Sequence, residues 1–306
     1  MRSIKTLVSY GCIALMTAAA CCAPLLAADK ALPNDLQDIA ARGEIVIGVR
    51  ESALPFSFLE TDGSAAGYTI AICQKIAEQL RHTLNRPDLR VRYNHTMAVT
   101  RALLVRENVI DMDCGATSHT ASREKLFGFS LSIGIEQAQL VSLAGSAYKS
   151  LDELAGKRLL VTDGSTTHDL LKAKKVSGSL KAEIVPVRTA ARAYYSLKDN
   201  KGDAYIGNPE MFRGELLMRS AKIADFAFHP LETPIEPLAI MLHKNHTGLK
   251  SVIDQTIIDM ANAGELRALY QTWFEQPITR RGINLGAAPG PEWQSVLAVP
   301  HARPAD

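Results

Sequence analysis

Two polar turns in this sequence, rich in hydroxyl side chains and arginine, have the residue types needed to hold an anion. The first, residues 114–123, follows an expected strand and precedes an expected helix, and it carries Thr117, Ser118 and Arg123. Helix N-termini present unpaired backbone N–H groups and a positive dipole end, which suits an anion. A guanidinium matches a carboxylate with two parallel hydrogen bonds. This turn therefore predicts a carboxylate site.

A second turn of the same form lies at residues 162–167, and its polar side chains include Thr162, Asp163 and Ser165. Ordinary helix N-capping by serine and threonine is the alternative explanation for each turn taken alone. The recurrence of the pattern favours two halves of one binding site.

Two further arginines stand at the same kind of position. Arg50 ends an expected strand, and Arg101 opens an expected helix directly after Thr100. Solvent exposure is the alternative for each arginine considered alone. In an open α/β sheet, however, these edges line the ligand crevice. Together with Arg123, they predict a ligand with more than one carboxylate.

Alternating strands and helices position these residues. The first part of the chain has the pattern of a βαβαβ unit, with strands over residues 44–50, 89–93 and 109–114 and helices over residues 67–80 and 99–107. This alternation is typical of a layered α/β domain.

A second α/β unit begins near residue 141. It contains expected strands over residues 158–162, 184–187 and 203–206, and expected helices over residues 166–172 and 190–197. A strand over residues 238–242 and helices over residues 249–263 and 265–274 follow. Beyond residue 277 the chain is rich in Gly, Pro and Ala, and we expect it to wrap loosely on the surface.

The N-terminus has the pattern of an export signal. Arg2 and Lys5 precede an uncharged run that ends in small residues before Asp29, which predicts a signal peptide over residues 1–28 and a periplasmic chain. A membrane anchor is one alternative, disfavoured by the polar residues and proline within the run. Lipid anchoring at Cys21 is another, disfavoured because the alanine three positions earlier is smaller than the usual aliphatic.

Charge, composition and cysteine content restrict the kinds of partner and fold that this sequence can have. Without Arg2 and Lys5, the 34 Lys+Arg residues become 32 and balance the 32 Asp+Glu residues, which argues against a nucleic-acid partner. Hydrophobic residues make up 47% of the 306 residues, as in a globular protein. Cys73 and Cys114 are the cysteines outside the leader, and they either pair or remain two buried thiols.

Motifs for catalysis or cofactor binding are absent from the sequence. It has no nucleophile elbow, phosphate-binding Walker loop or zinc-protease motif, and no Cys-x-x-Cys after the leader. His243 and His246 are close in sequence but have no third ligand beside them. We therefore expect no metal, no cofactor and no catalytic residue.

Several segments resemble the periplasmic amino-acid-binding proteins of ABC importers, most of all their glutamate/aspartate-binding members. The similar segments are residues 44–58, 67–68, 111–118 with Arg123, 129–130 and 273–278. The resemblance extends over roughly residues 35–285. It implies an α/β protein with the two-lobed, type II periplasmic-binding-protein (Venus flytrap) fold and a ligand cleft between the lobes.

The resemblance also implies a division of the chain and a set of partners. Lobe 1 comprises residues 29–140 and a return segment over residues 236–285, lobe 2 comprises residues 141–235, and residues 286–306 form the tail. The expected partners are a small carboxylate ligand, an acidic amino acid, and the membrane permease of an ABC importer. The protein itself is expected to be a monomer.

By position, the resemblance assigns roles to the candidate residues. The ligand α-carboxylate would be clamped by Arg123 with the hydroxyls of Thr117, Ser118, Thr162 and Ser165. Arg50 and Arg101 would face the second carboxylate.

Some positions depart from the family pattern. Asn208 stands where an aspartate usually binds the ligand ammonium, Ala116 where a serine is common, and Ala190 where acidic-amino-acid binders tend to have histidine. Asp163 is therefore our candidate for the ammonium. The alternative is a dicarboxylate without an amine, for which Asn208 is the better neighbour.

An enzyme and a sensor ectodomain are the two alternatives to a binding protein. Cyclohexadienyl dehydratases resemble these binding proteins, and such an enzyme needs a general acid or base, for which Glu210 and Asp163 are the candidates. A sensor ectodomain would require a membrane helix and a signalling domain after the lobes, and the sequence shows neither. We expect a binding protein and not an enzyme.

Overall fold

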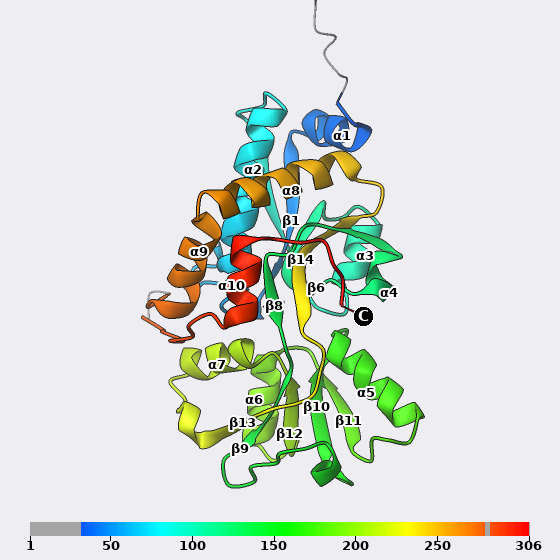
Figure 1. The fold of residues 1–306 in the computed structure, drawn as a ribbon, viewed down its shortest axis with the longest axis vertical. Helices are drawn as coiled ribbons and strands as arrows, with labels where there is room; N and C mark the ends of the chain where they lie inside the picture. Colours follow the sequence, from blue (N-terminus) through cyan, green and yellow to red (C-terminus); the bar gives the residue numbers. More distant parts are fainter. Residues whose placement is uncertain (1–31, 279–281, 306) are drawn as a thin grey trace, which may run out of the picture. The chain divides into compact units, whose positions relative to one another are not determined.

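The computed structural model describes residues 32–278 and 282–305. The predicted signal peptide and Cys21 lie outside these residues. Residues from Leu32 onward form one compact unit, in which a larger and a smaller β-sheet are both flanked by helices (Figure 1). Within the described residues, no helix has both the length and the apolar character to cross a membrane.

The larger sheet has the strand order β5-β1-β6-β14-β7, with β8 also paired to β14. Its strands are β1 (Glu44–Arg50), β5 (Arg90–Thr96), β6 (Met112–Ser118), β7 (Phe127–Phe129), β8 (Gly134–Glu136) and β14 (Glu236–His243). β1 runs parallel to β5 and β6, whereas β14 is antiparallel to β6, β7 and β8. The parallel strands β1 and β6 therefore end at the same edge, at Arg50 and Ser118.

The smaller sheet has the order β11-β10-β12-β9-β13. Its strands are β9 (Gln139–Leu143), β10 (Arg158–Thr162), β11 (Glu183–Val187), β12 (Ala204–Gly207) and β13 (Phe226–Pro230). β10 is parallel to β11 and β12, so Thr162 and Gly207 end at one edge. A third, short sheet contains β2 (Ser52–Ala53), β3 (Ser57–Leu59) and β4 (Ala65–Ala66).

Helices cover the two main sheets and start at the strand edges (Figure 1). Around the larger sheet are α1 (Asn34–Arg42), α2 (Tyr68–Thr83), α3 (Arg101–Arg106), α4 (Ala121–Glu124), α8 (Thr247–Asn262), α9 (Glu265–Tyr270) and α10 (Pro291–Ala298). Around the smaller sheet are α5 (Thr166–Val176), α6 (Ala190–Lys198) and α7 (Pro209–Met218). Short 3₁₀ turns lie at Asp152–Leu154 and Ile223–Asp225, and a π turn at Gln271–Glu275 follows α9.

The apolar residues whose helical spacing predicted α2 form the buried face of that helix. Ile70, Cys73, Ile76 and Leu80 are all buried in the core of the larger sheet. The Asp35 carboxylate, in the first turn of α1, accepts a hydrogen bond from the backbone N–H of Leu249, at 2.8 Å. It therefore joins α1 to the first turn of α8.

The chain crosses between the two main sheets twice. One crossover lies between β8 and β9, and the other between β13 and β14. The two run side by side, since the Gln137 amide donates to the Thr233 carbonyl (2.8 Å) and the Thr233 hydroxyl donates to the Ala138 carbonyl (3.3 Å). Both crossovers are short and extended, which suits a hinge.

The C-terminal segment packs against the core and is not loosely wrapped. The ring of Trp293, in α10, lies 6.3 Å from the ring of Phe56 and 5.4 Å from that of Phe274. Farther on, Ala305 forms backbone hydrogen bonds with His119 and Ala121. Burial of aromatic and aliphatic side chains outweighs the Gly- and Pro-rich local composition.

Cys73 and Cys114 form a disulfide that ties α2 to β6, with their Cα atoms 6.6 Å apart. Both residues are fully buried. The pair closes a loop across 41 residues of sequence, so it restricts the unfolded chain substantially.

Replacing both cysteines, as Cys73→Ala/Cys114→Ala, is expected to lower the free energy of unfolding by about 2–4 kcal/mol, because the unfolded chain regains loop entropy. Urea titration followed by circular dichroism measures this loss. The wild-type protein treated with a reductant is the matched control and should lose a similar amount. An unchanged urea midpoint in both samples would contradict the prediction.

Candidate ligand-binding site

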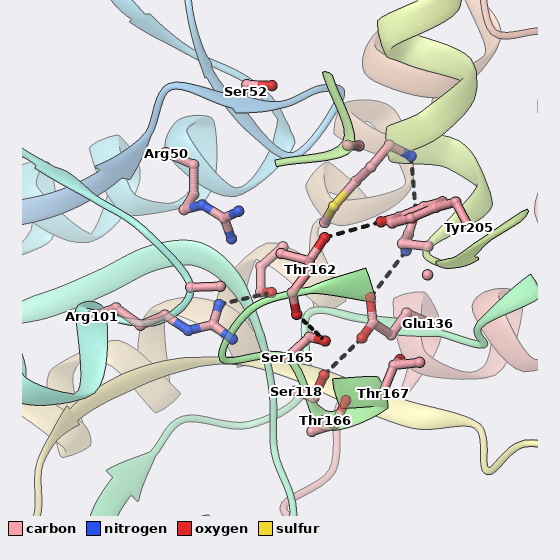
Figure 2. Close-up of a pocket in the computed structure, with 16 residues that line it drawn as sticks. Arg50, Ser52, Arg101, Ser118, Glu136, Thr162, Ser165, Thr166, Thr167 and Tyr205 are labelled. Carbon is pink, nitrogen blue, oxygen red and sulfur yellow. Dashed lines mark hydrogen bonds between the residues drawn. The ribbon is translucent and has the colours of Figure 1, made fainter. Parts of the chain in front are cut away.

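A polar pocket lies where the edges of the two main sheets meet, and side chains from both sheets line it (Figure 2). Its volume of about 50 Å³ suits a few water molecules or one small solute. The lining residues are Arg50, Ser52, Ala98, Arg101, Ala116, Ser118, Glu136, Thr162, Ser165, Thr166, Thr167, Ala190, Tyr205, Gly207, Asn208 and Met211.

Arg50 is the last residue of β1 and is only 6% exposed. Its stem crosses Gly115, where an added Cβ would lie 3.0 Å from the Arg50 Cγ atom, so glycine leaves room for it. Within the described part of the chain, the Arg50 guanidinium has neither a hydrogen-bond acceptor nor a carboxylate within ion-pair distance. Burial first, and the nearby Arg101 charge second, lower the pKa of Arg50 to about 10.

Arg101, the first residue of α3, is 4% exposed. The single hydrogen bond of its side chain among the described residues runs from Nη1 to the Ala116 carbonyl, at 3.4 Å. Figure 2 shows the guanidinium groups of Arg50 and Arg101 turned toward the same space. Two buried positive groups with so few acceptors favour an incoming anion.

Glu136, the last residue of β8, supplies the opposite charge. Its Oε1 accepts a hydrogen bond from the Ser118 hydroxyl at 2.9 Å, and its Oε2 accepts one from the Asn208 amide at 3.2 Å. Burial, and next the neighbouring Glu236 carboxylate, raise the pKa of Glu136 to about 7. The Glu136 carboxyl group can therefore change its protonation state near neutral pH.

Asn208 caps α7 in a way that fixes its amide. Its Oδ1 accepts the backbone N–H of Met211 at 2.9 Å, and its Nδ2 donates to Glu136. The amide thus directs its N–H group, and not its oxygen, toward the Glu136 carboxylate. The Asn208 amide therefore presents a hydrogen-bond donor to Glu136.

The second predicted turn is ordered by its own hydroxyl groups. The Ser165 Oγ donates to the Thr162 carbonyl at 2.7 Å and accepts the backbone N–H of His168 at 3.1 Å, which caps α5. The Thr162 and Tyr205 hydroxyl oxygens lie 3.1 Å apart. The first turn of α5 therefore faces the pocket with the orphan N–H groups of a helix N-terminus.

The structure brings six of the nine predicted site residues into this pocket: Arg50, Arg101, Ser118, Thr162, Ser165 and Asn208. Thr117, Arg123 and Asp163 are not among its lining residues. Thr117 is fully buried on the other face of β6, where its hydroxyl donates to the Asp113 carboxylate. Asp163 is 43% exposed and pairs with His168 at 3.2 Å.

Arg123 lies beside the pocket instead of in it. Its guanidinium donates to the carbonyl oxygens of Ser118 (3.1 Å) and Gly164 (3.2 Å), and so connects α4 with the loop before α5. Arg123 lines a neighbouring cavity of about 430 Å³. Glu136 borders both this cavity and the pocket, so the two spaces are adjacent.

Sequence reasoning missed Glu136, Tyr205 and Met211 as lining residues. A signal for Glu136 exists, because it is a charged residue in the last few positions before the expected lobe boundary, where the chain must pass the cleft. Tyr205 lies within a correctly expected strand, but only the sheet register shows which way it faces. Met211 lies one helical turn after the Asn208 cap.

The candidate catalytic and metal-binding residues lie elsewhere. Glu210 is not a lining residue and has its nearest ion-pair partner in Arg213, at 3.7 Å. His243 and His246 have ring centroids 5.0 Å apart. Across residues 32–278 and 282–305, no group of three or more His, Cys, Asp or Glu residues is placed to hold a metal ion.

Comparison with known proteins places this site in context. The family described as bacterial extracellular solute-binding proteins, family 3, matches residues 45–276. A Pseudomonas aeruginosa protein named L-glutamate/L-aspartate-binding protein is 29% identical over 100% of this chain and 99% of its own length. An Escherichia coli protein named glutamate/aspartate import solute-binding protein is 26% identical over 91% of this chain and 93% of its own length.

The fold is shared with solved structures of binding proteins. The substrate-binding protein of an ABC uptake transporter from Streptococcus pneumoniae, solved with bound histidine, superposes with a TM-score of 0.71. It is 19% identical, and the alignment covers 80% of this chain and 98% of that protein. The two-sheet α/β architecture is thus the type II periplasmic-binding-protein fold, and this chain belongs to family 3 of the bacterial extracellular solute-binding proteins.

Proposed function

We propose that this protein captures an acidic amino acid outside the cytoplasm and delivers it to the permease of an ABC importer. The relatives in P. aeruginosa and E. coli, which are named for glutamate and aspartate, support this choice of ligand. The proposal includes a periplasmic location, a signal peptide over residues 1–28 and a monomeric protein.

One observation carries the proposal: Arg50 and Arg101 are buried and face one pocket without a carboxylate partner among the described residues. A buried unpaired charge costs several kcal/mol relative to a paired one. A ligand carboxylate offsets this cost and can bind a planar guanidinium through two hydrogen bonds. The arginine pair therefore favours a ligand with two carboxylates.

The charge of the pocket matches an acidic amino acid. Ionised Arg50, Arg101 and Glu136 together carry one net positive charge. Glutamate and aspartate carry one net negative charge, so the complex is electrically neutral. Neutralisation matters here because both arginines are buried.

Closure of two lobes around the ligand is the proposed mechanism, with residues 29–140 and 236–285 in one lobe and residues 141–235 in the other. Close contacts between the two regions support it. A Cβ added at Gly214 would lie 2.5 Å from the Leu54 Cδ2 atom, and one at Gly164 would lie 2.5 Å from the Val99 Cα atom. Glycine at these positions lets the two regions approach.

Two other functions each have one observation in their favour. An amine-free dicarboxylate suits the replacement of an acidic residue by Asn208. A dehydratase-type enzyme suits the near-neutral pKa of Glu136, since a general acid works best near the ambient pH. Incubation with prephenate tests the enzyme, because turnover that disappears in Glu136→Gln would support it.

Arg50→Gln is expected to weaken glutamate and aspartate binding at least 100-fold, because a charged hydrogen-bond pair to a carboxylate is lost in a buried site. Isothermal titration calorimetry measures the affinity.

Arg90→Gln is the matched control, because Arg90 is exposed and pairs only loosely with Glu44, at 3.6 Å. Its affinity for glutamate and aspartate should stay within about twofold of the wild-type value. If Arg50→Gln bound both amino acids as tightly as this control does, the proposed role of the arginine pair would be wrong.

Gly214→Ala is expected to weaken ligand binding about tenfold or more without touching the ligand. The new methyl group would press on Leu54 and disfavour the closed arrangement. Alanine also favours the helical conformation of α7, by about 1 kcal/mol relative to glycine, so the ligand-free protein should not be destabilised through its helix. Calorimetry and thermal melting measure the two effects.

Gly145→Ala serves as the control, because a Cβ at Gly145 meets no atom within 4 Å. Equal affinities of the two variants would show that the α7 contact has no part in closure.

A further inference from the structure

Glu136 is the one acidic residue among those that line the pocket. Figure 2 shows it on the opposite side of the pocket from Arg50 and Arg101. Within the described part of the chain, no ion pair or hydrogen bond joins Glu136 to either arginine, so a ligand can contact the positive and the negative groups separately. A ligand that bridges them must present carboxylate on one side and a cation on the other.

Hydrogen bonds hold the Glu136 carboxylate in place from both sheets. The Ser118 hydroxyl, at the end of β6, donates to one oxygen, and Asn208, which caps α7, donates to the other. Each carboxylate oxygen has a second lone pair available for a further donor. The group is therefore positioned to accept hydrogen bonds from an ammonium without being reoriented.

Asn208 does not offer an equivalent acceptor. Its amide oxygen carries no net charge and already accepts the backbone N–H of Met211, and its nitrogen is a donor directed at Glu136. Asp163 lies outside the pocket lining and is paired with His168. Negative charge at the pocket wall comes from Glu136.

We propose that Glu136 binds the ammonium group of the ligand and is the residue that selects amino acids over amine-free dicarboxylates. Asn208 and Ser118 then act as positioning residues for its carboxylate. This inference rests on the proposed function, because it concerns the ligand class of the same pocket.

Because charged groups surround Glu136, we expect ligand binding to be coupled to the release of its proton. The charged and titratable groups near it are Arg50, Arg101, Arg123, Tyr205 and Glu236. Without ligand, its pKa of about 7 leaves the carboxyl group mostly protonated at pH 6.5. A bound ammonium lowers this pKa, so binding an amino acid at pH 6.5 should release most of one proton, and binding at pH 8.5 should release almost none.

The test is calorimetric titration of the full mature protein with glutamate, aspartate and succinate. Glu136→Gln keeps the shape and the acceptor oxygen but removes the charge. It should weaken glutamate and aspartate binding about 10–100-fold, the effect of one charged hydrogen bond, and leave succinate binding unchanged or tighter.

The matched control is Glu236→Gln. Glu236 is the first residue of β14, accepts a hydrogen bond from Thr166 at 2.6 Å, and does not line the pocket. Removing its charge should change amino-acid affinity by less than about threefold at pH 8.5. A loss equal to that of Glu136→Gln would point to general electrostatics and overturn the assignment.

Proton release is measured by repeating the glutamate titration at pH 6.5 in two buffers of different ionisation enthalpy. Wild-type protein should release protons, and Glu136→Gln should release none. Equal amino-acid affinities of the two proteins, with no proton release, would overturn the role of Glu136 alone. If neither amino acids nor succinate bound to the wild type, the proposed function itself would fail.

Discussion

The buried guanidinium of Arg50, at the end of β1, is the charge that the larger sheet has to accommodate. Its cost in desolvation is reduced by Asp113, a fully buried carboxylate in β6 that raises the pKa of Arg50 against the effect of burial. Gly48 and Gly115 leave the space, since a Cβ on either would come within 3.2 Å of the Asp113 carboxylate. Asp113 compensates only part of this charge, because Arg101 adds a second positive group beside it. The edge of the sheet therefore carries excess positive charge, which a bound anion would neutralise.

The two crossovers between the main sheets each lie next to a carboxylate. Glu136 stands at the first crossover, and Glu236 at the start of β14 after the second. Each accepts a hydrogen bond from a residue of the smaller-sheet region, Asn208 and Thr166 respectively. Of these two carboxylates, only Glu136 lines the pocket, so the first crossover is the one that carries a charged group to the proposed ligand.

Local sequence patterns were sufficient to predict most elements, and the type II fold that the family resemblance implied is confirmed. The periodicity of α2 and the capping serine of α5 are properties of neighbouring residues, so sequence alone carries them. The loose wrapping expected beyond residue 277 was wrong, and the contact of Asp35 was not predicted, because the partners of these residues are distant in sequence. The carboxylate of Asp35 binds a backbone group more than two hundred residues away, and Trp293 packs on rings brought together only by the fold.

The candidate site was harder to predict than the fold, because a strand alternates its faces. Thr117 and Ser118 are adjacent, and both belong to the predicted turn, yet one faces Asp113 and the other faces Glu136. Which of them meets the ligand depends on sheet register, which no local pattern specifies. Asn208 illustrates the same point for function. Its replacement of an acidic residue suggests a lost ammonium site, but the fold places Glu136 against its amide, and the charge can be supplied from a different strand.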